Sequence, residues 1–210
     1  MWSTHDMGPP LRLTRAAAKA RTRELLLAAA AQVFAEHGYA GASVDEIAAQ
    51  AGYTIGALYS HFSGKDELFL TLFDLHAAGH LRDIEEIIRQ CTGDPDFAAL
   101  GDYLATLADN DSCRWALESE FRRHAMTRPE LMARLAERRA AGQTAIAGLM
   151  PGRRPGTAQC AEDDAALVIT QLEGLILQRR LNPASVPPGL FAEALRRFFP
   201  PPTWAGAAAL

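Results

Sequence analysis

The sequence predicts an all-α protein, with an N-terminal three-helix unit containing a helix-turn-helix and a larger helical domain after it. Apolar residues recur at helical spacing near the start, as Leu26, Ala30 and Phe34 show, which is typical of a helix with one buried face. Residues that typically begin or end helices recur through the first seventy positions. After residue 91 no stretch shows the apolar and polar alternation of a strand.

The first two helices are marked by local signals. The first is expected from Thr14 to Gly38, because glycine readily takes the left-handed conformation at a helix end. Ser43 and Glu46 have the spacing of a capping box, in which each residue satisfies a backbone group at the start of a helix. They predict a second helix, which Gly52 ends.

Two further helices complete the N-terminal part. Thr54 can cap a third helix over Ile55 to about His61, so the second and third helices form a helix-turn-helix. Ser63 and Asp66 have the spacing of another capping box and predict a long helix to about residue 90.

The later helices are separated by the loops "TGDPD", "PGRRPGT" and "NPASVPPG". They are expected at about Phe97–Ala108, Ser112–Ala125, Pro129–Leu149, Glu162–Leu181 and Leu190–Phe199. The predicted organisation is a flexible arm (1–14), an N-terminal helical domain (15–66, with the helix-turn-helix at about 43–62), a larger helical domain (67–200) and a flexible tail (201–210).

Composition limits the class of protein. Of 210 residues 49% are hydrophobic and 22% charged, which favours a folded chain with a substantial core. The three cysteines are widely spaced and form no CxxC pair, so we expect reduced thiols. No apolar stretch resembles a signal peptide or a membrane span, and we expect a cytoplasmic protein. The sequence contains no phosphate-binding loop and no G-x-S-x-G motif, so nothing favours an enzyme.

Positive charge is concentrated near the N-terminus, although the net charge is −4. From residue 11 to residue 23 there are five basic residues and no acidic one: Arg12, Arg15, Lys19, Arg21 and Arg23. A basic segment on an acidic protein is compatible with contact to a polyanion such as DNA.

The third predicted helix has the features of one that enters the major groove of DNA. Leu58 and Phe62 form its buried stripe, and its outer face carries small or polar side chains. The outer residues are Ile55, Gly56, Ala57, Tyr59 and Ser60. Glycine costs about 1 kcal/mol in a helix relative to alanine, which suggests that the backbone at Gly56 approaches something closely. Hydroxyl groups of Ser43, Thr54 and Tyr59 can bond phosphates.

Lys65 lies in the first turn of the fourth helix, where the helix dipole disfavours a cation. This position suggests an external anion, such as a DNA phosphate. Each signal has an ordinary alternative. A capped helix, a glycine turn and a second capped helix also describe a generic helical corner. Tyr59, His61 and Lys65 taken singly are ordinary surface residues, so the prediction depends on their combination.

The stretch "RTRELLLAAAAQVFAEHGYAGASVDEIAAQAGYTIGALYSHFSGKDELF" resembles the DNA-binding domain of the tetracycline-repressor (TetR) family of bacterial regulators, without gaps over about fifty residues. The resemblance implies that Ser43, Thr54, Gly56, Tyr59, His61 and Lys65 contact operator DNA; we add Ile55, Ala57, Ser60 and Arg15 as candidates. Two positions depart from the common family pattern. Ile55 stands where a basic residue is frequent, and Ala57 where a hydroxyl residue is frequent, so the operator sequence is open.

The resemblance also implies that the larger domain forms a homodimer and binds a small-molecule effector, with release of a repressor from its operator. The last two helices carry more apolar residues than one buried face of each helix needs, which predicts a dimer interface. The predicted interface residues are Leu167, Leu172, Gly174, Leu175, Ile176, Leu195 and Phe198. The alternative is that these helices fold back on their own domain. "ESEFRRHAMTRPELMARL" resembles a common C-terminal subtype of the family, which identifies no effector.

The candidate pocket residues lie on helices that surround the pocket in this family: Phe69, Phe73, Phe97, Tyr103, Leu104, Trp115 and Phe121. Aromatic residues at such spacing also form ordinary cores. No cofactor is expected. His76 and His80, with Asp83 one turn on, raise the possibility of a metal site, but no HExxH motif or further ligand is evident. A second reading without catalysis is an architectural DNA-binding protein that has no effector.

Overall fold

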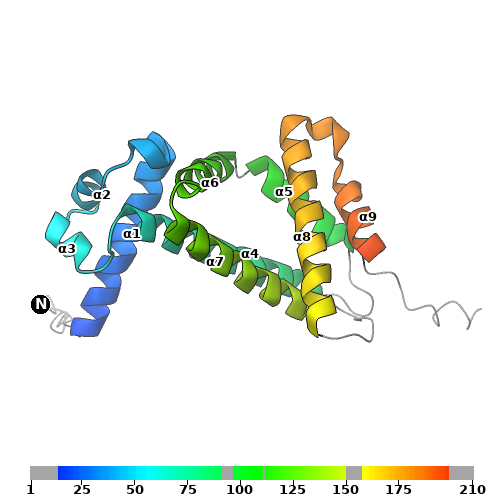
Figure 1. Ribbon diagram of the computed structural model, residues 1–210, viewed down its shortest axis with the longest axis horizontal. Coiled ribbons are helices and arrows are strands. Elements are labelled where there is room, and N and C mark those ends of the chain that lie inside the picture. The colour runs from blue at the N-terminus through cyan, green and yellow to red at the C-terminus, as the bar shows by residue number, and fades with distance from the viewer. Residues whose placement is uncertain (1–13, 91–96, 111, 150–157, 199–210) are drawn as a thin grey trace, which may run out of the picture. The chain divides into compact units, whose positions relative to one another are not determined.

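The computed structural model describes residues 14–90, 97–110, 112–149 and 158–198, and every regular element within them is helical (Figure 1). The all-α prediction is therefore confirmed. The helices are α1 (Arg15–Gly41), α2 (Val44–Gln50), α3 (Ile55–Tyr59), α4 (Lys65–Gln90), α5 (Phe97–Asn110), α6 (Ser112–Ala125), α7 (Pro129–Leu149), α8 (Ala158–Leu181), the 3₁₀ turn η1 (Pro183–Ser185) and α9 (Pro188–Phe198). None of these helices is both long and apolar enough to cross a bilayer.

The chain divides into two compact units, Met1–Leu72 and Phe73–Leu210. The division falls six residues later than the expected boundary after residue 66. The first turns of α4 explain the difference, because Leu68, Phe69 and Leu70 are buried and belong to the first unit. The expected flexible tail, and all of the expected arm except Thr14, lie outside the described residues.

The first unit is built around a core from all four of its helices. Phe34 of α1, Ile47 of α2, Leu58 of α3 and Phe62 each expose no more than 1% of their surface. This confirms the predicted buried stripe of α3. Phe69 of α4 extends the core, with edge-on ring contacts to its aromatic neighbours.

Glycines mark a kink in α1 and the turn after α2. Gly38 has φ 70° and ψ 175°, a backbone conformation that side chains disfavour, so the predicted end of the first helix is a kink within α1. One more helical turn, residues 39–41, follows before the chain becomes extended at Ala42. Gly52, with φ 74°, separates α2 from α3.

The capping signals are confirmed in part. The Ser43 hydroxyl accepts a hydrogen bond from the backbone N–H of Glu46 at 3.1 Å. The Glu46 carboxylate lies 2.9 Å from Nε2 of His37, so it links α2 to α1. At the start of α4 the predicted partner is wrong. The backbone N–H of Ser63 donates to the carboxylate of Glu67 at 2.6 Å, because Asp66 is used elsewhere.

The core of the second unit is formed by α5, α8 and α9, with isoleucines of α4 packed against it. In Figure 1, α8 and α9 run alongside each other. The closest approach joins α5 to α9 at Gly101, where a Cβ atom would lie 2.8 Å from the carbonyl oxygen of Pro188 and 3.0 Å from the amide nitrogen of Ala192. Only a glycine fits this contact without displacement.

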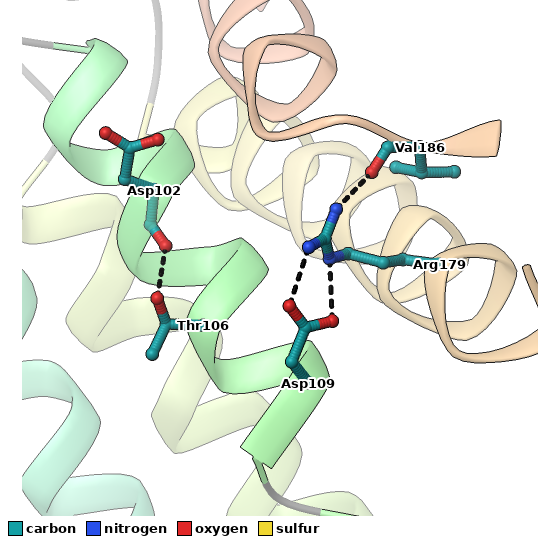
Figure 2. A network of polar contacts seen from close by, with 5 residues as sticks. All are labelled: Asp102, Thr106, Asp109, Arg179 and Val186. Atoms are coloured by element: carbon teal, nitrogen blue, oxygen red, sulfur yellow. Dashed lines mark hydrogen bonds and ion pairs between the residues drawn. The ribbon is translucent and has the colours of Figure 1, made fainter. Parts of the chain in front are cut away.

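Arginine and carboxylate pairs join the helices of the second unit at their surfaces. Figure 2 shows Arg179 of α8, which donates two hydrogen bonds to Asp109 at the end of α5 and a third to the carbonyl oxygen of Val186. Arg139 of α7 makes a second two-point contact, with both of its hydrogen bonds to Glu173 of α8 at 2.9 Å. These pairs hold the packed helices in register.

Candidate nucleic-acid interface

The helix-turn-helix places α3 on the outside of the first unit. The turn closes through a hydrogen bond of 2.9 Å from the Tyr53 amide to the Ala48 carbonyl. Regular α3 ends at Tyr59, two residues before the expected end, although hydrogen bonds to the carbonyl of Leu58 continue the turn to Phe62. The short helix is fixed by one fully buried residue, Leu58.

The outer face of α3 carries most of the predicted DNA contacts. Ile55 and Tyr59 expose 40% and 53% of their surface, so both side chains are open to a partner. Among the other predicted residues, Arg15, Ser43, Thr54, Gly56 and Ser60 are exposed, while Ala57, His61 and Lys65 are half-buried. The structure therefore presents a nearly continuous exposed face on α3.

The hydroxyl groups that cap α2 and α3 accept a hydrogen bond within the chain and keep a hydrogen that they can donate to a ligand. Thr54 Oγ1 accepts from the Ala57 amide at 3.2 Å, and Ser43 Oγ accepts from the Glu46 amide. Since a hydroxyl also has one hydrogen to donate, both groups can still donate outward. Ser60 differs, because its hydroxyl donates to the Ala57 carbonyl at 2.6 Å. Toward a ligand Ser60 can therefore act as an acceptor.

Gly56 has no internal packing reason to be glycine. A Cβ atom built there would meet nothing closer than Thr54 Oγ1 at 3.9 Å, which is an ordinary contact. The conformational cost of glycine in α3 is thus not explained by crowding within the chain. Close approach of another surface, such as a DNA backbone, would be a reason that lies outside the chain.

Lys65 has an internal partner that the sequence did not reveal. Its ammonium donates to the carbonyl oxygens of Tyr39 at 2.8 Å, Ala42 at 3.0 Å and Ala40 at 3.4 Å. It also lies 4.6 Å from the centre of the Tyr39 ring. Although Lys65 opens its own helix, it meets the end of α1, where carbonyl groups favour a cation. Its position at the start of α4 is therefore explained by partners within the chain.

The basic segment of the N-terminus has a mixed role. Arg15 and Lys19 are exposed on α1, and Arg21 faces Glu24 of the same helix at 3.5 Å. Arg23 turns inward: it stacks 4.2 Å from the Phe62 ring and donates to the His61 carbonyl at 3.2 Å. It therefore holds the end of the α3 turn against α1. Arg12 lies outside the described residues.

A second link from α1 to the turn was missed by sequence reasoning. The hydroxyl groups of Thr22 and Tyr53 are 3.3 Å apart, although 31 residues separate them. Neither residue lies on a cap or a buried stripe, so no local pattern points to the pair. Its effect is to fix the turn before α3.

The predicted pocket residues divide between the two units. Phe69 lies in the core of the first unit, where its ring contacts those of Phe34 and Tyr39 at 5.6 and 5.4 Å. Leu104 belongs to the core of the second unit, and Phe97, Tyr103 and Trp115 pack against that core. Phe73 is half-buried and Phe121 is fully buried.

Trp115 is the pocket candidate with a distinctive environment. Its indole N–H is buried and finds no hydrogen-bond partner within the described part of the chain. The guanidinium groups of Arg180 and Arg114 lie 5.6 and 5.9 Å from the ring centre. Burying a donor without an acceptor is costly, so an acceptor on a bound molecule would relieve this cost.

The histidine pair considered for a metal is drawn into a different arrangement. Nδ1 of His80 lies 2.7 Å from the hydroxyl of Tyr103, which in turn donates to Asp83 at 3.1 Å. His76 is exposed. Within the described residues no three side chains that commonly ligate metals converge.

The predicted interface residues also divide. Ile176 and Leu195 are buried in the core of their own unit, which leaves them little surface for a partner. Leu172, Leu175 and Phe198 pack partly against this core, whereas Leu167 and Gly174 are exposed. The spacing of apolar residues along α8 did not show which side of the helix faces the core. Fewer of the predicted residues of α8 are exposed than expected.

An open groove runs between α8 and α9. Its volume is about 240 Å³, and Leu175, Leu190 and Phe198 supply its apolar lining. Glu193 and Arg197 stand at the same groove. The groove borders the exposed side of α8, so the two features form one surface of the second unit.

A capped helix-turn-helix with an exposed outer helix, followed by a second helical unit, defines a DNA-binding protein of the helix-turn-helix class. The family described as "Bacterial regulatory proteins, tetR family" matches residues 26–72, and the domain described as "Tetracyclin repressor-like, C-terminal domain" matches residues 95–201. The chain belongs to the TetR family of transcriptional regulators.

Known relatives are similar over different lengths. The transcriptional activator FasR of Mycolicibacterium smegmatis is 40% identical over 70 residues, which are 33% of this chain and 32% of the relative. The chain thus matches about a third of that curated relative. A transcriptional regulator from Rhodococcus sp. Rha1 is 33% identical, with a TM-score of 0.58 over 84% of this chain and 92% of that one. The regulator FadR of Bacillus subtilis, solved with stearoyl-CoA, is 18% identical and shares the fold, with a TM-score of 0.62 over 83% and 96% of the two chains.

Proposed function

We propose that this protein is a homodimeric, sequence-specific repressor that leaves its operator when a small molecule binds to the second unit. The observation that carries the DNA-binding part is the outer face of α3, where Ile55 and Tyr59 are exposed beside a glycine that internal packing does not require. A helix of this kind fits the major groove of DNA.

The face of α3 suggests how DNA is read. Tyr59, Thr54 and Ser43 can donate hydroxyl hydrogen bonds to phosphates on either side of the groove. Ile55 has no polar atom on its side chain, so its natural contact is the methyl group of a thymine. Gly56 lets the backbone of α3 approach closely. The phosphate contacts would position the protein on DNA, and Ile55 would read the base sequence.

The exposed side of α8 supports the dimer. Leu167, Gly174 and Leu181 are seven residues apart and so lie on one side of the helix. Leu167 and Leu181 expose 58% and 73% of their surface. Gln171 and Gln178 fill the same side without a charge. An uncharged leucine surface around a glycine suits a second copy of the helix, and two copies supply the two reading heads that a symmetric operator needs.

The effector is proposed from the second unit. Trp115 offers a buried N–H with no partner among the described residues, next to an apolar core that includes aromatic side chains. An apolar molecule with a hydrogen-bond acceptor fits these groups. FadR of Bacillus subtilis was solved with stearoyl-CoA, an example of a small-molecule complex in the same fold. Effector binding would lower operator affinity by changing the spacing of the two heads.

Repression is favoured by the description of the matched C-terminal domain as repressor-like, whereas FasR is named an activator. Footprinting on genomic fragments captured by the purified protein tests the proposal. We expect two half-sites related by two-fold symmetry, about 10 base pairs or a multiple apart. Tyr59→Phe should weaken binding to all fragments alike. A footprint without symmetry would contradict the dimeric reader, and Tyr59→Phe binding like the wild type would contradict the phosphate contact.

A further inference from the structure

We propose that Lys65 supports DNA binding as a positioning residue, by holding the end of α1 and with it the start of α2, and that it does not contact a phosphate. This role in DNA binding rests on the proposed function. Of the three tests below, only the third uses DNA.

The contacts of Lys65 use its whole hydrogen-bonding capacity. An ammonium group has three hydrogens to donate and no lone pair. The three oxygen atoms nearest to Nζ are the carbonyls of Tyr39, Ala40 and Ala42, between 2.8 and 3.4 Å away. Contact with a phosphate would require the loss of at least one of these charge-assisted bonds.

The neighbouring residue strengthens the same junction. The carboxylate of Asp66 accepts a hydrogen bond from the hydroxyl of Tyr39, whose side chain is almost completely buried. Lys65 lies over the ring of Tyr39, 4.6 Å from its centre. The first turn of α4 therefore holds Tyr39 both by its ring and hydroxyl and by its backbone.

The segment held in this way leads directly into the helix-turn-helix. The Ala42 carbonyl is the last of the three acceptors, and the next residue, Ser43, caps α2 through the amides of Glu46 and Ile47. Because the backbone at Gly38 is not helical, residues 39–42 do not continue α1 in a straight line. The bonds from Lys65 hold this segment, so the position of the α2 cap depends on this side chain.

The first test uses the fact that the chain contains only two lysines, Lys19 and Lys65. Lys19 is exposed on α1 and serves as an internal reference. The DNA-free protein is acetylated with a limiting amount of an N-hydroxysuccinimidyl acetate, and each lysine is followed by mass spectrometry. Lys65 should react about tenfold more slowly than Lys19, since loss of a charge-assisted bond must precede attack. Equal rates in the absence of DNA would overturn the proposal.

The second test follows amide hydrogen exchange. In Lys65→Ala the amides of Ala42, Glu46 and Ile47 should exchange about tenfold faster, while Val33 in the middle of α1 should not change. Lys65→Arg keeps the charge, but its planar guanidinium cannot point at three convergent carbonyls, so it should not restore slow exchange. Exchange as slow as in the wild type in both variants would contradict the proposed role of Lys65.

The third test separates positioning from phosphate contact. A lysine that neutralises a phosphate contributes about 0.9 to the slope of log K against log salt for each protomer bound. We expect Lys65→Ala to weaken operator binding about tenfold with an unchanged slope. A shallower slope with unchanged hydrogen exchange would show a phosphate contact and overturn the proposal. If neither variant nor wild type binds DNA, the proposed function fails. The acetylation and exchange results still show whether Lys65 holds the end of α1.

Discussion

Arg179 and Asp109 face each other across α8 and α5 in a two-point hydrogen bond, with Nε to Oδ1 at 2.8 Å and Nη2 to Oδ2 at 2.6 Å (Figure 2). The guanidinium holds the pKa of Asp109 below its ordinary value, chiefly through this hydrogen bond. The same bond raises the pKa of Arg179. The pair therefore stabilises the folded form while Asp109 is ionised.

The pair predicts a dependence of stability on acid. Since the pKa of Asp109 is lower in the folded protein, its contribution is complete above the unfolded value, about 3.9, and is lost as the pH falls through the folded value. Melting temperature between pH 2.5 and 6 measures this loss. In Asp109→Asn the decline below pH 4 should be smaller than in the wild type. Asp102→Asn, an exposed change on the same helix, should keep the wild-type decline; equal declines in all three proteins would contradict the role of the pair.

Gly101 should be intolerant of a methyl group. In Gly101→Ala the new Cβ would meet the Pro188 carbonyl at 2.8 Å, so α5 and α9 must separate. We expect a loss of roughly 1–3 kcal/mol in the free energy of unfolding, measured with urea. Gly142→Ala on α7 is the matched control, because no neighbour lies within 4 Å of its new Cβ. That change should stabilise by about 0.5–1 kcal/mol. Equal effects at the two positions would show that the close approach is wrong.

Gly174 should separate folding from assembly. A side chain there meets nothing within 4 Å in the single chain, so Gly174→Leu should fold normally. If a partner's helix packs on this side of α8, the added side chain should weaken the dimer at least about tenfold through overpacking. Sedimentation measures the dissociation constant. Gly148→Leu on α7, also in open space, is the control and should leave it unchanged. A dimer unaffected by Gly174→Leu would place the interface elsewhere.

Ile55 should govern sequence preference more than overall affinity. Its exposed side chain lies on the outer face of α3 and has only apolar atoms to offer. Ile55→Asn should lose a contact with a thymine methyl and gain a hydrogen bond to adenine, a change of roughly 1–3 kcal/mol in discrimination at one base pair. Selection of bound sequences from a random pool measures the preference. An unchanged selected sequence with lower affinity would show that Ile55 does not contact a base.

Features set by neighbouring residues could be predicted from the sequence. Gly38, Gly52, Ser43 and Thr54 act within a few positions of themselves, because helix ends are decided by local hydrogen bonds. The buried stripe of α3 was predicted for the same reason, since Leu58 and Phe62 are one turn apart. The order of the helices, and most of their ends to within a few residues, therefore needed no knowledge of tertiary contacts.

Features that depend on distant partners could not be predicted. The partners of Lys65 are the backbone carbonyls of Tyr39, Ala40 and Ala42, more than twenty positions away, so the sequence suggested a phosphate instead. Phe69 was named as a pocket candidate because its helix borders the pocket in the family that the sequence resembles, whereas its ring contacts lie in the first unit. Ile176 and Leu195 were predicted at a dimer interface because α8 and α9 carry more apolar residues than one buried stripe needs, and periodicity does not show which side their neighbours cover.

The most direct test of the central claim measures binding of the purified protein to its own promoter fragment over a range of salt concentrations, together with its mass in sedimentation. The account predicts a dimer whose affinity falls steeply as salt rises, since exposed hydroxyl and basic groups of two heads meet phosphates. A monomer that binds this fragment no better than unrelated DNA, with no dependence on salt, would contradict the account.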